Sequence, residues 1–380
     1  MYTLVIGRAF PAKETGMMGI FEFEQAAALN KYGMSTVYAF CDTRSIKTLR
    51  KLNYKEFTNE NVPVYGYHFP IGGMPRSIFD KLKTNKYKNL LKKIIENHGK
   101  PGIIHIHFPL ITMHFSIWEY LKQLNVPIVC TEHWSKVQNK EIEPFRKKLL
   151  IKLLQESDKY TTVNYELKNV ILELTKLNKK VEVIPNMVSK EFTFVQREIK
   201  KNVIQFIAIG RLVKDKRYLE LIKSFYNAFQ NTEDVELLII GNGPEEKPLQ
   251  KLINQFDLKN KVKLMGFMSR DNVAKKLQES DIYVSASKTE TFGVPYIEAL
   301  ACGTPIIGKK NGVIENLLAN IDYGKYYENI KELESIMLDM YNNIESYKRE
   351  ILSIKTIESY GEKSMYNQLA EIYTEVRKDY

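Results

Sequence analysis

The sequence predicts an α/β fold in two domains, each a parallel sheet with helices on its faces, and three observations predict it. The chain has 380 residues, which fits about two domains of ordinary size. Short apolar runs alternate with amphipathic stretches, as they do in βαβ units. The same alternation starts afresh in the second half of the chain.

Each half contains several segments of strand or helix pattern. In the first half, strands are expected at 2–6, 36–40, 103–107 and 128–131, with a helix at 21–31. In the second half, strands are expected at 203–209, 236–240, 262–264, 282–285 and 304–307, with helices at 219–229 and 248–256. Pro248 suits the first position of the last of these helices, because no backbone hydrogen bond is lost there. Both halves therefore follow the rhythm of a parallel sheet with crossover helices.

The domain boundary is expected where this pattern breaks, at 192–201. We therefore predict a first domain over 1–190, a second over 191–355 and a terminal segment over 356–380. Apolar residues recur at helical spacing in that terminal segment, so it is expected to form one amphipathic helix.

Basic residues are concentrated in the first half of the chain. The net charge is +11; residues 1–190 carry 29 Lys+Arg and 17 Asp+Glu, which gives +12, and the remainder carries 27 and 28, which gives −1. The excess predicts attraction to an anionic partner, such as a membrane surface, a phosphate-bearing substrate or nucleic acid. Nucleic acid is disfavoured, because no recognition motif or aromatic–basic platform appears.

The sequence also bears on location and redox state. No apolar run reaches the roughly 18 residues that span a bilayer, and the first residues read as a strand rather than a signal peptide. We therefore expect a cytoplasmic protein. Cys41, Cys130 and Cys302 are scattered in apolar surroundings, which predicts buried, reduced thiols.

Two carboxylates eight residues apart, Glu290 and Glu298, flank a predicted helix start at Gly293. The helix is expected over 295–302, and its exposed N-terminal amides form an anion site. Carboxylates before and one turn inside such a site can grip hydroxyl groups on either side of a bound diphosphate. Two ordinary acidic residues near a helix start remain the alternative.

Cationic residues follow the first strand of the second half. Arg211 and Lys216 come directly after Gly210, at the carboxyl end of a buried strand, where α/β sheets bind ligands. Two cations there can neutralise a diphosphate leaving group; a solvated basic loop is the alternative. The glycine turn Gly241-Asn242-Gly243 after the next strand is a weaker signal of the same kind.

The first half offers a glycine loop and a histidine at strand ends. Gly16 and Gly19 precede the helix at 21–31, and glycines there let a backbone approach a phosphate closely; an ordinary turn is the alternative. His133 follows a strand. His105 and His107 alternate in another strand and so face one side. Such a pair can ligate a metal, but no third ligand is evident, so strand-end packing or the lining of an acceptor pocket is preferred.

Taken together, Gly210-Arg211 to Lys216, the glycine turn and Glu290 to Glu298 resemble glycosyltransferase family 4, a retaining family with the GT-B architecture. The resemblance covers nearly the whole chain. It implies two Rossmann-like domains whose parallel sheets face each other across a cleft, with the last helix crossing back to the first domain. The chain departs from the family pattern at 184–189, before the domain boundary, and at 310–315, where one glycine stands instead of two.

The resemblance also implies residue roles. Glu298 would hold the ribose of the donor, Glu290 and His133 the donor sugar at the reacting centre, and Gly266 would lie beside the base. The diphosphate would meet Gly19, Arg211, Lys216 and the amides of Phe292, Gly293 and Val294. The predicted catalytic residues are thus Glu290, His133, Arg211 and Lys216. No Asp-x-Asp sequence occurs, so no metal and no cofactor are expected.

The expected function is retaining transfer of a sugar from a nucleoside diphosphate, a UDP-sugar first and GDP-mannose second, to a glycan or polyprenyl-linked acceptor in surface polysaccharide or glycoconjugate synthesis. The lysine-rich stretch 76–100 would let the protein lie on the inner face of the cell membrane; a solvated helix face is the alternative. A GT-B epimerase or phosphorylase remains open. A non-catalytic partner subunit is disfavoured, because Arg211, Lys216, Glu290 and Glu298 are all present.

Overall fold

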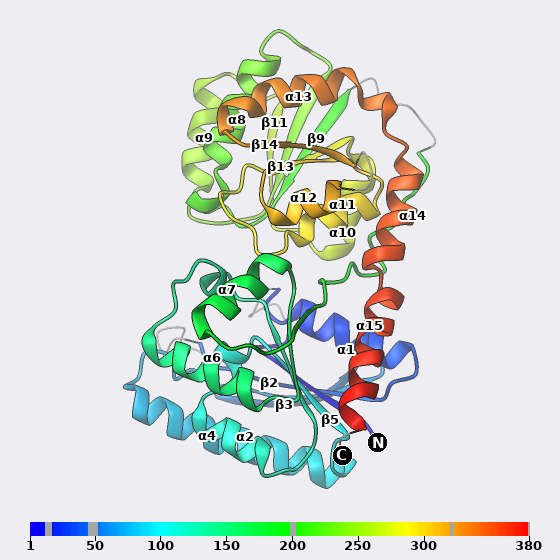
Figure 1. The fold of residues 1–380 in the computed structure, drawn as a ribbon. Helices are drawn as coiled ribbons and strands as arrows, with labels where there is room; N and C mark the ends of the chain where they lie inside the picture. The colour runs from blue at the N-terminus through cyan, green and yellow to red at the C-terminus, as the bar shows by residue number, and fades with distance from the viewer. Residues whose placement is uncertain (12–16, 45–51, 198–202, 320–322, 379–380) are drawn as a thin grey trace. The chain divides into compact units, whose positions relative to one another are not determined.

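The computed structural model describes residues 1–11, 17–44, 52–197, 203–319 and 323–378. The chain forms two compact units, each with its own sheet (Figure 1). Unit 1 comprises Met1–Met187 and Glu362–Tyr380, and unit 2 comprises Val188–Gly361. The sequence-based boundaries lie at 190/191 and 355/356. Within the described ranges, no helix has both the length and the apolar character needed to cross a bilayer.

Unit 1 is an eight-stranded sheet in the order β3-β4-β2-β1-β5-β6-β7-β8. Its strands are β1 Thr3–Gly7, β2 Thr36–Asp42, β3 Asn53–Asn59, β4 Val62–His68, β5 Ile103–His107, β6 Ile128–Glu132, β7 Lys159–Thr162 and β8 Val181–Val183. Its helices are α1 Ile20–Lys31, α2 Arg76–His98, α3 Pro109–Thr112, α4 Phe115–Lys122, α5 Ser135–Gln138, α6 Pro144–Glu156, α7 Tyr165–Thr175 and α15 Glu362–Arg377. The central strands are buried along their length, as expected of a parallel sheet covered on both faces.

The edge of this sheet departs from the predicted parallel pattern. β3 pairs antiparallel with β4, and the two are joined by Glu60 and Asn61, both with positive φ (46° and 60°). Such a pair of left-handed residues makes the tight turn of a hairpin. The sequence analysis did not identify β3, because most of its residues are polar and exposed and no apolar run marks it. It also missed β4, in which Pro63 and Gly66 interrupt the apolar residues.

The core of unit 1 joins residues far apart in the chain. α15 lies beside α1 (Figure 1), with the Tyr32 and Tyr366 rings 5.4 Å apart and Leu369 and Tyr373 buried in the same cluster as α1 residues. Alanines at 26–28 in α1 let this helix pack close to the sheet. The last helix is therefore an integral part of unit 1.

Unit 2 is a six-stranded parallel sheet in the order β11-β10-β9-β12-β13-β14. Its strands are β9 Ile204–Ile209, β10 Val235–Ile240, β11 Val262–Gly266, β12 Ile282–Val284, β13 Ile306–Lys309 and β14 Gly324–Tyr327. Its helices are α8 Tyr218–Phe229, α9 Glu246–Gln255, α10 Arg270–Glu279, α11 Val294–Ala301, α12 Gly312–Leu318, α13 Leu333–Asn342 and α14 Arg349–Tyr360, with 3-10 turns at Lys214–Lys216, Ile330–Glu332 and Ile344–Ser346.

Two helix predictions need correction. α9 begins at Glu246, so Pro248 is its third residue and not its first. The terminal segment is not one helix: α14 ends at Tyr360 and α15 begins at Glu362, because the chain turns extended at Gly361 (φ −73°, ψ 169°). An ideal Cβ at Gly361 would lie 2.4 Å from the Ile357 carbonyl oxygen, so a side chain there would collide with α14.

Candidate functional site

The carboxyl edge of the unit 2 sheet gathers the loops that follow β9, β10, β11 and β12. The Gly210 N–H donates to the Ile240 carbonyl at 3.0 Å, and the Gly241 N–H donates to the Gly266 carbonyl at 2.9 Å. These bonds join the ends of three adjacent strands directly. The sequence-predicted residues Arg211, Lys216 and Gly266 thus belong to one edge, as the switch-point rule for α/β sheets requires.

Glycine is required where these loops touch. An ideal Cβ on Gly241 would lie 1.9 Å from the Gly210 carbonyl oxygen, and one on Gly243 would lie 2.4 Å from the Leu212 carbonyl oxygen. Both glycines have positive φ, 144° and 158°. The turn that looked weakest in the sequence therefore holds two neighbouring loops in close contact.

Lys216 and Glu290 form the first ion pair at this edge. The Lys216 ammonium donates to Glu290 Oε1, although the two residues are 74 apart in the chain. A backbone bond from the Lys288 N–H to the Asp215 carbonyl, 2.8 Å, ties the same two loops together. Arg211 lies on the Lys216 loop with its side chain exposed to solvent. Lys216 therefore meets the first carboxylate directly, and Arg211 lies on the same loop.

The start of α11 supplies backbone amides. Gly293 caps the helix in a left-handed conformation (φ 70°, ψ 49°), Val294 is its first residue, and Pro295 follows in the first turn. An ideal Cβ on Gly293 would lie 2.4 Å from the Tyr296 ring. Phe292, just before the cap, is buried against Tyr360. The amides at 292–294 lie at the positive end of the helix dipole, which suits a phosphate group.

Glu298 and Arg270 form the second pair, and Arg270 is a residue that the sequence analysis missed. Glu298 is 4% exposed, and its Oε1 accepts from Arg270 Nη1 at 2.8 Å. Burial raises the pKa of Glu298 above its usual range, and Arg270 opposes that rise. Arg270 opens the helix that follows the Gly266 loop, in a polar run that carries no motif to mark it.

The loop after β11 remains open. Gly266 has φ 68°, and among the described residues, its two chain neighbours aside, no atom lies within 4 Å of the position that a Cβ would take. The neighbouring Phe267 is 58% exposed. An exposed aromatic ring beside open backbone can stack on a planar ligand.

In unit 1, His133 is held by a network at the ends of β5 and β6. His133 Nε2 and His107 Nδ1 share a hydrogen bond of 2.9 Å, and the His133 ring stacks on Phe108 with centroids 4.6 Å apart. Glu132 Oε1 accepts from the backbone N–H groups of His133 and Trp134, both at 3.0 Å. The side chain of His133 therefore has a fixed orientation.

Burial sets the protonation states in this network. Desolvation, reinforced by the charge of Arg8, lowers the pKa of His133 to about 3. It also lowers the pKa of His105 and of His107 well below the usual range. Desolvation raises the pKa of Glu132 to about 7. The three histidines are therefore neutral at pH 7, and in each ring one nitrogen donates a hydrogen bond while the other accepts one.

A small cavity lies beside this network. It has a volume of about 10 Å³, room for roughly one water molecule. His107 and Gln25 line it, and neither His107 Nε2 nor Gln25 Oε1 has a hydrogen-bond partner among the described residues. His133 and Asn186 complete its polar lining. The cavity can therefore hold a water or a hydroxyl group.

Gly19 is the cap of α1 and is a required glycine. It has φ 89°, and an ideal Cβ would lie 1.9 Å from the Ala9 carbonyl oxygen. Gly19 thus lies directly against the backbone of Ala9. Gly16, the other glycine of the predicted loop, lies outside the described residues.

The histidine pair at 105 and 107 faces one side of the sheet, as its alternation predicts. The two ring centroids are 4.3 Å apart. His105 bonds to the Tyr373 hydroxyl and to Thr131 Oγ1, each at 2.6 Å, so it serves internal packing, whereas His107 lines the cavity. Within the described ranges, no three His, Cys, Asp or Glu side chains are grouped so as to hold a metal ion.

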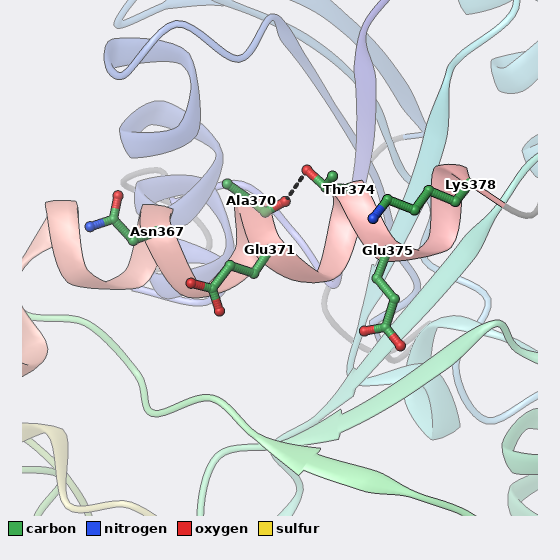
Figure 2. Close-up of a pocket in the computed structure, with 6 residues that line it drawn as sticks. All are labelled: Asn367, Ala370, Glu371, Thr374, Glu375 and Lys378. Atoms are coloured by element: carbon green, nitrogen blue, oxygen red, sulfur yellow. Dashed lines mark hydrogen bonds between the residues drawn. The ribbon is translucent and has the colours of Figure 1, made fainter.

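A second hollow lies on the outer face of α15 (Figure 2). Apart from Ala370, its lining side chains are polar, and the Thr374 hydroxyl donates to the Ala370 carbonyl at 2.7 Å within the helix. Glu375 pairs with Lys159 at 2.6 Å. This open face offers no convergent groups for a small ligand, in contrast to the carboxyl edges of the two sheets.

Comparison with known proteins covers most of the chain. The sequence matches the family described as "Glycosyl transferases group 1" over residues 189–354 and the family described as "Glycosyltransferase Family 4" over residues 36–192. It is 29% identical over 234 residues to the N-acetyl-alpha-D-glucosaminyl L-malate synthase of Bacillus anthracis. The aligned stretch covers 58% of this chain and 60% of that protein.

The chain is also similar to a second curated relative and to a solved structure. The sequence is 29% identical over 143 residues to the alpha-monoglucosyldiacylglycerol synthase of Acholeplasma laidlawii, 37% of this chain and 36% of that protein. The chain thus spans about 60% or less of the curated relatives it matches. The structure of Anabaena Alr3699/HepE in complex with UDP and glucose shares its fold, with a TM-score of 0.73, 16% identity, and coverage of 99% of this chain and 100% of that one.

Proposed function

Because the chain belongs to glycosyltransferase family 4, with the GT-B fold, we propose that it transfers a hexose from a nucleoside diphosphate sugar with retention of anomeric configuration. One observation carries the proposal: the carboxyl edge of unit 2 joins the Lys216–Glu290 pair to the loops that also carry Arg211 and Gly266. An ammonium group, helix amides and carboxylates gathered there match the needs of a sugar diphosphate.

The leaving diphosphate is the group that this edge would stabilise. In the proposed step the acceptor oxygen bonds to the anomeric carbon while the bond from that carbon to the phosphate oxygen breaks. Its electron pair goes to the phosphate, which takes the acceptor's proton. Lys216, Arg211 and the amides at 292–294 would offset the developing charge. No carboxylate is needed as a nucleophile, so attack comes from the face that the phosphate leaves.

Glu290 and Glu298 are assigned to binding in this scheme. Glu290, next to Lys216, would accept from hydroxyls of the donor sugar, and the buried Glu298 from hydroxyls of the ribose. Gly19 and His133, in unit 1, keep their sequence-based assignments to the phosphate and the sugar. Cations and amides supply the positive charge, so we propose that neither a divalent metal nor a cofactor is required.

A UDP-sugar is the first choice of donor and GDP-mannose the second. A UDP-bound complex of the same fold supports this order. Incubation with a panel of UDP-, GDP- and ADP-sugars, followed by thermal shift and hydrolysis, tests it. At least one donor should raise the melting temperature, and Glu290→Ala or Arg211→Ala should cut its turnover at least 100-fold. Wild-type turnover in either variant contradicts the assignment.

Product analysis separates transfer from the remaining alternatives. A transferase releases a nucleoside diphosphate and a glycoside with the donor's anomeric configuration. An epimerase instead returns an altered sugar, and a phosphorylase needs inorganic phosphate. Full activity in a chelating buffer is expected, and loss of activity that Mg²⁺ or Mn²⁺ restores contradicts the metal-free proposal.

The acceptor is proposed to be a glycan or a polyprenyl-linked sugar at an anionic membrane surface. Lys81, Lys88 and Lys92 on α2 are exposed, whereas Lys83 is buried and donates to the Ile111 carbonyl at 2.8 Å. Leu90, Leu91 and Ile94 of the same helix are buried in unit 1. Attraction would therefore come from the lysines, at about 1 kcal/mol each, and not from insertion of apolar side chains.

Flotation with liposomes tests this surface. The wild type should float with vesicles of phosphatidylglycerol and phosphatidylcholine at low salt, and the triple change of Lys81, Lys88 and Lys92 to Gln should stay at the bottom. A matched triple change on unit 2, at Lys247, Lys251 and Lys259, should float like the wild type. Equal flotation of both triple variants removes the proposal.

A further inference from the structure

Arg270 is fixed on three sides at the start of α10. Its Nη1 donates to Glu298 Oε1 at 2.8 Å, and its Nη2 donates to Ser189 Oγ at 2.6 Å. Its guanidinium carbon lies 4.8 Å from the centre of the Phe192 ring. The side chain is 16% exposed. A planar guanidinium held by a carboxylate, a hydroxyl and an aromatic face has little freedom to turn.

Glu298 depends on this arginine for its charge and its orientation. The carboxylate sits on a fully buried turn of α11, and Glu191, another carboxylate, lies near enough to oppose its ionisation. Burial also favours the neutral acid. A neutral carboxyl group would donate with its single O–H, whereas an ionised one accepts only. Arg270 supplies the cation that holds Glu298 as an acceptor in its ion pair.

The geometry points to a division of labour between the two oxygens of Glu298. We propose that Arg270 is the positioning residue for the ribose: it occupies Oε1 of Glu298 and thereby presents Oε2 as a fixed acceptor for the ribose hydroxyls of a nucleoside diphosphate. This inference rests on the proposed function, in which Glu298 faces the ribose. It extends that function to a residue that no motif marks. Arg270 is assigned to recognition of the ribose, and not of the diphosphate or of the transferred sugar.

The position of Arg270 in the fold favours this role. It opens the helix that follows the exposed Phe267 and the open Gly266 loop, where the base is proposed to lie. Glu298 lies one turn inside the helix whose N-terminal amides are proposed to meet the diphosphate. A ribose joins a base to a diphosphate, so the Arg270–Glu298 pair falls where the chemistry of a nucleotide requires a hydroxyl acceptor.

The test compares two ligands that differ only in the hydroxyls. Kd is measured by calorimetry for whichever of UDP, GDP and ADP the wild type binds best, and for its 2′,3′-dideoxy counterpart. Because hydrogen bonds to a charged group are strong, the wild type should prefer the ribose form by about 10- to 100-fold. Arg270→Gln should reduce that ratio to about threefold or less, and should raise KM for the donor more than it lowers kcat.

Three comparisons make the result specific. Arg197→Gln removes an arginine of the same unit that pairs with a different carboxylate, Asp281, at 2.5 Å, and should leave the ratio unchanged. Glu298→Gln should lower the ratio as Arg270→Gln does, and the double variant should lose no more than either single one. Arg270→Lys, which keeps the charge but cannot hold Glu298 and Ser189 together, should restore only part of the ratio and serves if the glutamine variant does not fold.

The outcomes separate failure of the role of Arg270 from failure of the proposed function. A ratio that stays at the wild-type value in both Arg270→Gln and Arg270→Lys overturns the role of Arg270. So does a double variant in which the two losses multiply, because the residues would then act independently. If the wild type binds none of the three diphosphates, the proposed function itself fails, and this result is distinct from either of the others.

Discussion

Replacing Gly293 with alanine tests the anion-binding geometry at the start of α11. Gly293 has φ 70°, and a left-handed conformation costs an alanine about 1–2 kcal/mol. The added Cβ would lie 2.4 Å from Tyr296 Cδ2 and 2.8 Å from Cε2. Tyr296 cannot yield easily, because it is 2% exposed and its hydroxyl closely abuts Gly308 on the far side.

The magnitude follows from these two effects. Overpacking of a filled core costs about 1–3 kcal/mol, so the total destabilisation is about 2–5 kcal/mol, part of a typical stability of about 5–15 kcal/mol. The melting temperature should fall by roughly 4–20 °C for a unit of this size. The backbone, not the ring, must move, and a displacement of about 1 Å at the amides costs roughly 100-fold in kcat/KM.

Thermal unfolding and donor turnover, measured on the same preparation below the melting transition, separate the two consequences. Gly312→Ala is the matched control, because a Cβ there meets no atom within 4 Å at the first position of α12. It should leave activity unchanged and raise stability slightly. Wild-type turnover in a destabilised Gly293→Ala variant would refute the role of the amides, and an unchanged melting temperature would refute the packing argument.

Three further changes probe other parts of the molecule. Lys216→Met should lower kcat by about 100-fold with saturating donor, because it removes a cation proposed to face the leaving group. Burial raises the pKa of Glu132 from 4.5 to about 7, so the folded state binds this proton more tightly than the unfolded chain does. The resulting contribution to the free energy of unfolding is complete below pH 4.5 and is lost as pH rises through 7. Relative to the wild type, Glu132→Gln should therefore gain about 3 kcal/mol of unfolding free energy between pH 4.5 and 7.5, measured with urea. Tyr373→Phe should cost about 1–3 kcal/mol in the same assay, because buried His105 loses its 2.6 Å partner.

Control variants in the same elements test the Lys216 and Tyr373 predictions, and the pH profile tests the Glu132 prediction. Lys214→Met changes an exposed lysine of the same short turn as Lys216 and should leave kcat unchanged. Equal pH profiles of the wild type and Glu132→Gln contradict the raised pKa. Tyr366→Phe, on the helix that carries Tyr373, should cost less than Tyr373→Phe, and equal losses contradict the specific role of the buried bond.

The sequence predicted most of the sheet because buried parallel strands leave a strong apolar signal. β5 begins and ends where its apolar run does, and β9 and β10 differ from prediction by one residue. The antiparallel strand β3 left no such signal, because its side chains are largely exposed at the edge of the sheet. β7 is buried along its length as well, yet it was not predicted, because its residues Lys159–Thr162 form no apolar run. An apolar run, and not burial or strand formation itself, made strands visible in the sequence.

The candidate site was predictable only where chain-local patterns carry it. Gly293 and Glu298 could be assigned to a helix start from spacing alone, and Lys216 to a strand end. The contact of Lys216 with Glu290, and that of Arg270 with Glu298, join elements that only the folded sheet brings together. Arg270 stands in a run of polar residues that any exposed helix can have, so nothing local distinguishes it.

The return of α15 to unit 1 has a consequence for synthesis of the chain. During translation β1 through β8 leave the ribosome first. The apolar cluster of unit 1 nevertheless lacks Leu369, Ile372 and Tyr373 until α15 has been synthesised. Unit 2 is continuous in sequence and has all its residues before that point. The second unit to be translated is thus the first that can finish folding, and the apolar cluster of unit 1 stays incomplete until α15 is added.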